Sequence, residues 1–234
     1  MTSARAEGAA GSTESEVVAA FDFDGTLTTG GSVWSFLVRV RGPRPVAQAA
    51  MAVLPRLVAA ALFGGRAADD AKEALFRRTL GGLDASAVSE EAARFGRDHY
   101  ARRRRADVGA RVEQHRRHGH RLVIVSASPE LYVRAVADEL GFDAVIATRL
   151  EVGADGRLTG RYQGGNCRGG RKLDGLHRWT EAHAPGALVW AYGNSAGDRR
   201  LLGGADVGVD VGRLGPVGKL RAFRRLRDTA ELIG

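Results

Sequence analysis

Two aspartates two residues apart, Asp22 and Asp24, are the first residues of this chain whose types and spacing suggest chemistry. They follow the apolar run at 17–21, which predicts a buried strand, and they lead into Gly25 and Thr26. At a strand end, one carboxylate of such a pair can lie beside a metal while the second reaches a leaving group. The same residue types also form turns that cap helices, so the motif is interpreted together with the rest of the chain.

Two further apolar runs, 121–125 and 187–192, predict buried strands that end in polar residues. Ser126 and Ala127 follow the first run, and Asn194 and Asp198 follow the second. Short apolar strands that alternate with helices favour a parallel α/β sheet. In such sheets the ligand crevice lies beyond the carboxyl ends of the strands, so these residues are expected to meet the two aspartates there.

The glycine-rich stretch 169–172 contains Lys172 beside Arg171. Carboxylates that share a dry site need cations beside them. Lysine offers a point charge, whereas arginine favours a bidentate fork. The alternative for Lys172 is a solvated surface position, as the alternative for Ser126 is a helix cap.

Residues 32–105 show a helical pattern without strands, broken at glycines near 42, 64 and 81 into roughly four helices. This block is interpreted as an insertion that covers the crevice. Further elements are expected after it: helices at 108–118, 129–140, 173–184 and from 198, strands at 144–147 and 207–210, and a hairpin from 150–152 and 157–160.

Four motifs in this order resemble the haloacid dehalogenase (HAD) superfamily, in its phosphoserine-phosphatase-like branch with a helical (type 1) cap, subfamily IB. They are Asp22-Phe23-Asp24-Gly25-Thr26, Ser126 after its strand, Lys172, and the segment 193–198. The resemblance implies an α/β fold with a HAD-like Rossmannoid parallel sheet core and an inserted all-helical cap domain. The core would comprise 17–31 and 106–234, the cap 32–105, and a disordered leader 1–16.

The resemblance also implies a magnesium-dependent phosphomonoester hydrolase that works through an aspartyl-phosphate intermediate. Asp22 would be the nucleophile, Asp24 the general acid and base, and Lys172 the cation beside the phosphoryl group. Ser126 and Ala127, with Lys172, would bind that group. The implied Mg²⁺ ligands are Asp22, the backbone carbonyl of Asp24, Asn194 and Asp198.

Asn194 departs from the family pattern, which has an acidic metal ligand at this position. An asparagine still offers a carbonyl oxygen but removes one negative charge, so weaker Mg²⁺ binding, or a larger share for Asp198, is expected. A non-catalytic phosphoryl-binding protein stays open as an alternative for this reason.

The sequence indicates the substrate less clearly than the reaction. Phosphoserine phosphatases usually carry Glu at the position of Gly31 and Ser-Gly-Gly where this chain has Ser126-Ala127-Ser128. The segments around 147–167 look instead like a bacterial branch linked to phosphatidylglycerophosphate or lysophosphatidate. The apolar stretch 46–63 would then suit a membrane interface and the arginines at 102–105 an anionic headgroup, with a buried cap core and a solvated face as the alternative. Phosphoserine or another small metabolite stays the alternative substrate.

The composition indicates which kinds of binding partner and which cellular compartment are expected. The net charge of +8 and pI of about 10.4 come from arginine, with three lysines among 35 Lys and Arg residues, which is typical of GC-rich coding. The arginine run lacks interleaved aromatics, so no nucleic acid is expected. The chain has one cysteine, Cys167, so it has no pair for an intrachain disulfide. The N-terminal stretch lacks the apolar region of a signal peptide, and no uninterrupted run of 18 apolar residues suggests a membrane span. A cytoplasmic protein is predicted, with membrane association left open.

Overall fold

A seven-stranded sheet in the order β4-β3-β2-β1-β5-β6-β7 forms the centre of the computed structural model, which describes residues 16–212 and 223–233. The strands are β1 Val17–Phe21, β2 Arg121–Pro129, β3 Ala144–Val152, β4 Leu158–Gln163, β5 Leu188–Gly193, β6 Val207–Asp210 and β7 Arg224–Arg225. All neighbouring strands pair in parallel except β3 and β4, which form an antiparallel hairpin. The predicted parallel α/β class is confirmed.

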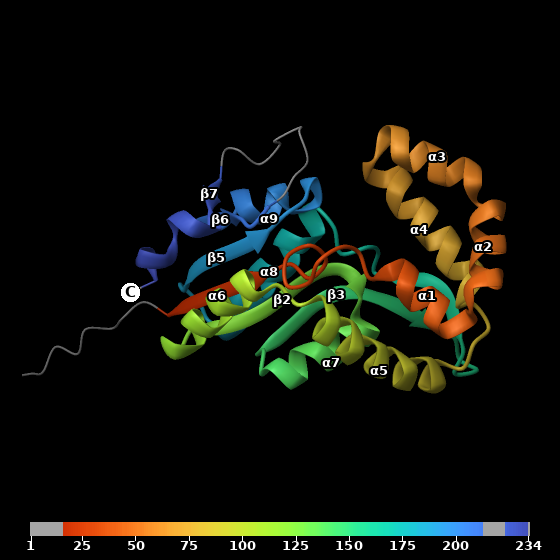
Figure 1. The fold of residues 1–234 in the computed structure, drawn as a ribbon, viewed down its shortest axis with the longest axis horizontal. Coiled ribbons are helices and arrows are strands. Elements are labelled where there is room, and N and C mark those ends of the chain that lie inside the picture. The colour runs from red at the N-terminus through yellow and green to blue at the C-terminus, as the bar shows by residue number, and fades with distance from the viewer. Residues whose placement is uncertain (1–15, 213–222, 234) are drawn as a thin grey trace, which may run out of the picture.

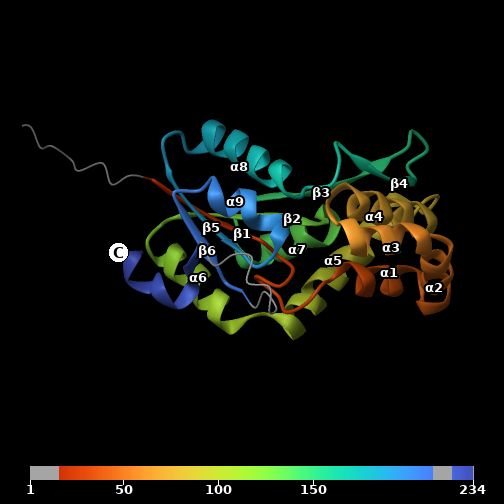
Figure 2. The same ribbon diagram turned by 90° about the horizontal axis from the view of Figure 1, so that it is seen from above.

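Helices cover both faces of the parallel part of the sheet (Figure 2). These are α6 Ala106–Arg117 and α7 Glu130–Leu140 on one face, and α8 Gly170–His183 and α9 Arg199–Gly203 on the other. Alternate residues of β1 point to opposite faces: Val18 and Ala20 belong to one buried cluster, and Ala19 and Phe21 belong to the other. A strand buried on both faces reads as a continuous apolar run, which explains the pattern at 17–21.

Five helices lie between β1 and α6, beyond one side of the sheet (Figure 1). They are α1 Val33–Arg41, α2 Pro43–Ala52, α3 Leu54–Phe63, α4 Gly65–Thr79 and α5 Ala85–Arg103. The expected four helices become five because the stretch 46–63 divides at Val53, where α2 and α3 are bent by 71°. Among the described residues, no single helix has the length and apolar character of a membrane span, although α2 and α3 together do.

The helical block is attached to the core at two places besides its chain connections. Helix α5 packs on α7, and α4 packs on the β3–β4 hairpin. The turn between α4 and α5 is hydrogen-bonded to the first residue of β4. Gly82 N–H donates to Leu158 O at 2.8 Å, and Leu158 N–H donates to Leu83 O at 2.9 Å. The hairpin therefore links the sheet to the helical block.

Several predicted boundaries were wrong. The strand expected at 144–147 and the first hairpin strand form the single strand β3, which continues past a register shift beside β2. Helix α8 begins at Gly170 rather than at 173, so Lys172 lies in its first turn and not in a loop. A further strand, β7, follows the predicted strand at 207–210 and was not predicted. The predicted leader lies outside the described residues except for Glu16.

Candidate active site

A small cavity at the carboxyl ends of β1, β2 and β5 brings most of the predicted site residues together. Its volume is about 110 Å³, and it is lined by Asp22, Asp24, Ser126, Ala127, Ser128, Arg168, Lys172, Ser195, Gly197 and Asp198. Wider clefts of about 600 and 830 Å³ lie elsewhere among the described residues, and neither contains these side chains. The position matches the crevice of open α/β sheets.

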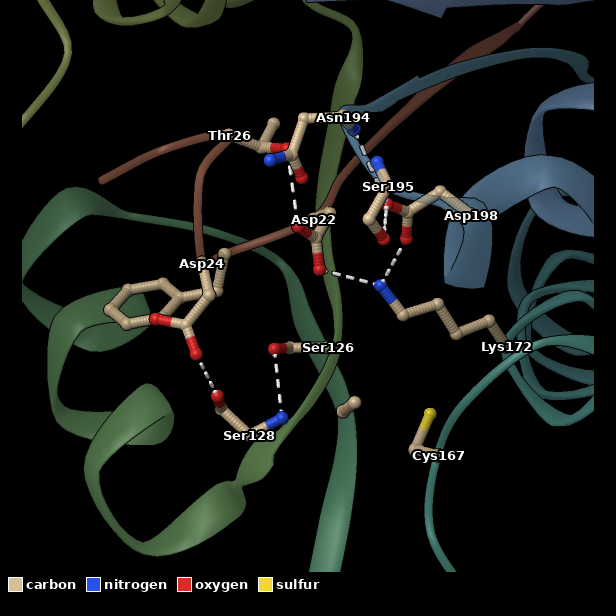
Figure 3. A network of polar contacts seen from close by, with 12 residues as sticks. Asp22, Asp24, Thr26, Ser126, Ser128, Cys167, Lys172, Asn194, Ser195 and Asp198 are labelled. Atoms are coloured by element: carbon tan, nitrogen blue, oxygen red, sulfur yellow. Dashed lines mark hydrogen bonds and ion pairs between the residues drawn. The ribbon is translucent and has the colours of Figure 1, made fainter. Parts of the chain in front are cut away.

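Lys172 is the buried cation of this cavity and lies between two carboxylates (Figure 3). Its Nζ is 2.5 Å from Asp22 Oδ1 and 2.6 Å from Asp198 Oδ1, and all three side chains are at most 7% exposed. Burial alone would lower the pKa of Lys172, but Asp198 and Asp22 raise it above its ordinary value. The lysine therefore carries its charge, and the surface alternative for Lys172 is excluded.

The pKa of Asp22 is raised to about 7, first by burial and then by Asp198, while Lys172 opposes the shift. Asp198 differs: burial would raise its pKa, but Lys172 and hydrogen bonds from Ser195 lower it. We attribute the contrast to the hydrogen bonds, because Asp198 Oδ2 accepts from Ser195 N, Ser195 Oγ and Asn194 N at 2.6–3.2 Å. The single charge of Lys172 therefore does not keep the pKa of Asp22 low, and a second cation beside Asp22 would favour its ionised form.

Oxygen donors for a cation converge from Asp22 and Asn194. The Thr26 hydroxyl lies 3.1 Å from Asp22 Oδ2 and 3.3 Å from Asn194 Oδ1, so both oxygens face the same place. Gly25, with a φ of 83°, permits this approach, since a Cβ there would lie 2.0 Å from the Asn194 amide nitrogen. Both carboxylate oxygens of Asp198 already accept hydrogen bonds.

This donor set fits Mg²⁺, a hard cation that binds to one or two carboxylates and keeps several water ligands. Over the described residues, no group of three or more His, Cys, Asp or Glu side chains is arranged as a metal site. The fit instead rests on one carboxylate, one side-chain amide oxygen and the shortage of positive charge at Asp22.

Asp24 lies in a network of hydroxyl groups that the sequence did not indicate. Its Oδ2 accepts from Ser128 Oγ at 2.5 Å and from Ser32 Oγ at 2.9 Å, and Ser32 Oγ also bonds to the Tyr132 hydroxyl at 2.7 Å. Asp24 Oδ1 is buried and has no hydrogen-bond partner among the described residues. One oxygen is thus held by the protein, and the other is left for a ligand.

Ser126 and Ala127 lie in the last part of β2, which continues to Pro129 rather than ending at 125 as predicted. The Ser126 Oγ accepts a hydrogen bond from Ser128 N–H at 3.0 Å, which leaves its own proton for a further acceptor. The Ala127 carbonyl accepts from Thr148 Oγ1 at 2.7 Å and from Lys72 Nζ at 2.5 Å.

Lys72 and Arg168 were missed by the sequence reading. Lys72, on α4, is partly buried, and this burial lowers its pKa to about 8, although Asp24 and Asp69 oppose the shift. Arg168 lines the cavity, and its Nη1 donates to Gly65 O at 3.4 Å. Ser128 could have been placed near Ser126 from the sequence, because side chains two residues apart on a strand share a face, but its bond to Asp24 could not. No sequence pattern pointed to Lys72 or Arg168.

Comparison with known proteins gives a consistent family. The sequence model described as haloacid dehalogenase-like hydrolase matches residues 19–203. Protein CicA of Caulobacter vibrioides is 36% identical over 191 residues, which cover 81% of this chain and 83% of CicA. A histidinol-phosphatase of Neisseria meningitidis is 30% identical over 84 residues, which cover 36% of this chain and 37% of that protein.

Solved structures share the fold at low identity. A Bordetella pertussis protein of unknown function has a TM-score of 0.75 at 22% identity, covering 90% of this chain and 98% of its own. A substrate-bound phosphoserine phosphatase has a TM-score of 0.66 at 18% identity, covering 94% of this chain and all of its own. These likenesses extend over the sheet and the helical block together.

Proposed function

The chain belongs to the haloacid dehalogenase-like hydrolases, and on that premise we propose that it is a magnesium-dependent phosphomonoester hydrolase that forms an aspartyl phosphate on Asp22. The observation that carries the proposal is the position of Asp22: its carboxylate lines the cavity at the end of β1, beside the buried Lys172. A carboxylate held next to a fixed cation, in a cavity of this small volume, suits attack on a phosphoryl group.

The first step is displacement at phosphorus. An Asp22 oxygen forms a bond to phosphorus, the bond to the ester oxygen breaks, and Asp24 passes a proton to that leaving oxygen. Lys172 offsets the charge on the phosphoryl oxygens, and the Ser126 hydroxyl donates to one of them. In the second step Asp24 takes a proton from water, the water oxygen attacks phosphorus, and the bond to Asp22 breaks to release phosphate.

Mg²⁺ would be held by the Asp22 carboxylate, the Asp24 backbone carbonyl and the Asn194 amide oxygen, and it would supply charge neutralisation beside the transferred phosphoryl group. Asp198, predicted as a further ligand, would contribute through its hydrogen bonds to Lys172 and Ser195. Its negative charge also favours a cation nearby. Asn194 is compatible with catalysis in this arrangement because it presents an oxygen to the site.

The helical block 32–105 would act as the cap over this site. The cavity of about 110 Å³ is far below the roughly 300–1,000 Å³ of pockets that enclose whole small molecules. It accommodates the phosphoryl group and leaves the rest of the substrate to the cap and to solvent. A lipid phosphate such as phosphatidylglycerophosphate or lysophosphatidate suits such a site, because its acyl chains would lie outside it. A small phosphorylated metabolite is the alternative substrate.

The test is phosphate release from lysophosphatidate, phosphatidylglycerophosphate, phosphoserine and sugar phosphates, with Mg²⁺ and with a chelator. Asp22→Asn is the matched blank because it keeps the size of the side chain and removes the nucleophile. Turnover that requires Mg²⁺ and disappears in Asp22→Asn is expected. Turnover retained in Asp22→Asn would refute the aspartyl phosphate, and a folded protein without turnover on any substrate would favour the non-catalytic phosphoryl-binding role.

A further inference from the structure

Helix α3 lies beside α4 at the outer edge of the cap (Figure 1). It carries a row of exposed apolar side chains. No residue of α3 is buried. The row, here called the apolar ridge, comprises Met51 at the end of α2 and Leu54, Val58, Leu62 and Phe63 of α3, which are 45–80% exposed. Leu54, Val58 and Leu62 recur every four residues and so follow one stripe of the helix. Exposed apolar residues gathered in this way mark an interaction surface.

The helices α1, α2 and α3 carry basic but no acidic side chains, and the α4 carboxylates Asp70 and Glu73 share a cavity with Arg56 without forming an ion pair with it. Residues 33–63 contain four arginines and no aspartate or glutamate. Arg39 pairs with Glu91 of α5. The other three, here called the arginine group, are Arg41, Arg44 and Arg56; all are exposed, and no carboxylate of the described residues forms an ion pair with them. Apolar side chains beside unpaired cations are complementary to an anionic lipid surface.

The ridge ends next to the candidate active site. Phe63, which is 80% exposed, is the last residue of α3, and the chain turns there into α4. Just past this turn, the Gly65 carbonyl accepts a hydrogen bond from Arg168, a residue of the cavity wall. Asp69 of α4 accepts from Asn166 at 2.6 Å, which holds the same corner of the cap against the core. A surface that binds the ridge therefore lies beside the mouth of the site.

We propose that the apolar ridge and the arginine group dock this protein on an anionic lipid bilayer, with the active-site mouth beside the headgroups. A second copy of the chain is a poorer occupant, because a two-fold contact through this face would bring two unpaired arginine groups together. The docking does not depend on the proposed catalysis, since turnover of a soluble phosphomonoester needs no bilayer.

The experiment is flotation of the full chain with vesicles of phosphatidylcholine alone and of phosphatidylcholine with phosphatidylglycerol. Binding to the anionic vesicles is expected, and it should weaken at high salt. Replacing the arginine group by glutamine should lower the partition coefficient by about a hundredfold, from a several-fold effect per basic residue. Leu62→Ser with Phe63→Ser should lower it by about tenfold or more.

A matched variant controls for net charge: Arg97, Arg117 and Arg178, which are exposed arginines on α5, α6 and α8, are replaced by glutamine instead. This variant should bind like the wild type. All variants should hydrolyse p-nitrophenyl phosphate at the wild-type rate, which separates a failure of docking from a failure of the proposed reaction. Equal binding by both triple variants, no binding by the wild type, or a concentration-dependent dimer that Leu62→Ser with Phe63→Ser abolishes would each overturn the proposal.

Discussion

Replacing Lys172 by methionine tests the charge balance of the site most directly. The substitution keeps a side chain of similar length but leaves Asp22 and Asp198 buried without the cation that lies 2.5 and 2.6 Å from them. Removing one partner of a buried ion pair costs about 3–5 kcal/mol. Two lost charge-assisted hydrogen bonds of roughly 1.5–3 kcal/mol each give the same magnitude. Against a typical stability of about 5–15 kcal/mol, the variant should fold with a clearly lower free energy of unfolding.

The pH dependence of this loss identifies its cause. Without Lys172, the folded-state pKa values of both carboxylates rise. The pKa of Asp22, which is about 7 even with the lysine present, moves further above its unfolded value, and Asp198 loses the cation that lowers its pKa. The folded state then binds more protons than the unfolded state, so its stability is retained at low pH and lost as the pH rises through the raised pKa values. The deficit of Lys172→Met should therefore be largest near pH 8 and smaller near pH 5.

The assay is urea unfolding followed by circular dichroism at pH 8 and pH 5. Asp22→Asn provides the matched background, because it removes one of the two charges that Lys172 balances. Lys172→Met should lower the free energy of unfolding less in the Asp22→Asn background than in the wild type. An equal deficit at both pH values, together with an equal cost in both backgrounds, would show that Lys172 stabilises the fold by packing alone and would refute the electrostatic reasoning.

Three further perturbations address separate parts of the molecule. Asn194→Asp adds a charge beside Asp22 and should lower the Mg²⁺ concentration for half-maximal turnover by about tenfold; an unchanged midpoint would remove Asn194 from the metal ligands. Ser128→Ala removes a hydrogen bond to Asp24. It should reduce kcat by roughly ten- to a hundredfold and shift the pH–rate profile, with little change in KM. A change in KM alone would refute a role of Ser128 in holding Asp24. His115 is buried against Tyr192, and its pKa is lowered to about 3, first by burial and then by neighbouring cations. The unfolded state therefore binds the extra proton as the pH falls from about 6.5, and roughly 5 kcal/mol of stability should be lost by pH 3. His115→Gln should flatten this part of the stability curve measured by denaturant unfolding, and an unchanged curve would exclude His115 as its source.

The parallel sheet was predictable because strands buried on both faces leave a simple signal. Runs such as 17–21 and 121–125 are continuously apolar, and each is followed at once by the residues that line the cavity. Since parallel strands present their carboxyl ends at one edge, the convergence of Asp22 with Ser126 followed from the alternation of elements. The local spacing of residues thus predicted which strand ends meet at the cavity.

Tertiary packing decided how each side chain of the site is held. Ser128 and Asp24 are 104 residues apart in the chain, and Lys72 is 55 residues from Ala127, so no local pattern indicates either contact. The 71° bend at Val53 is equally a product of packing, since a continuous apolar stretch fits one long helix or two short ones until its neighbours are placed. The sequence by itself therefore determined the fold class and most of the residues that meet at the strand ends, because these depend on periodicity and on where the strands end. Only the tertiary structure decided which hydroxyls hold Asp24 and which apolar face of the cap meets solvent, because those outcomes depend on distant segments packing together.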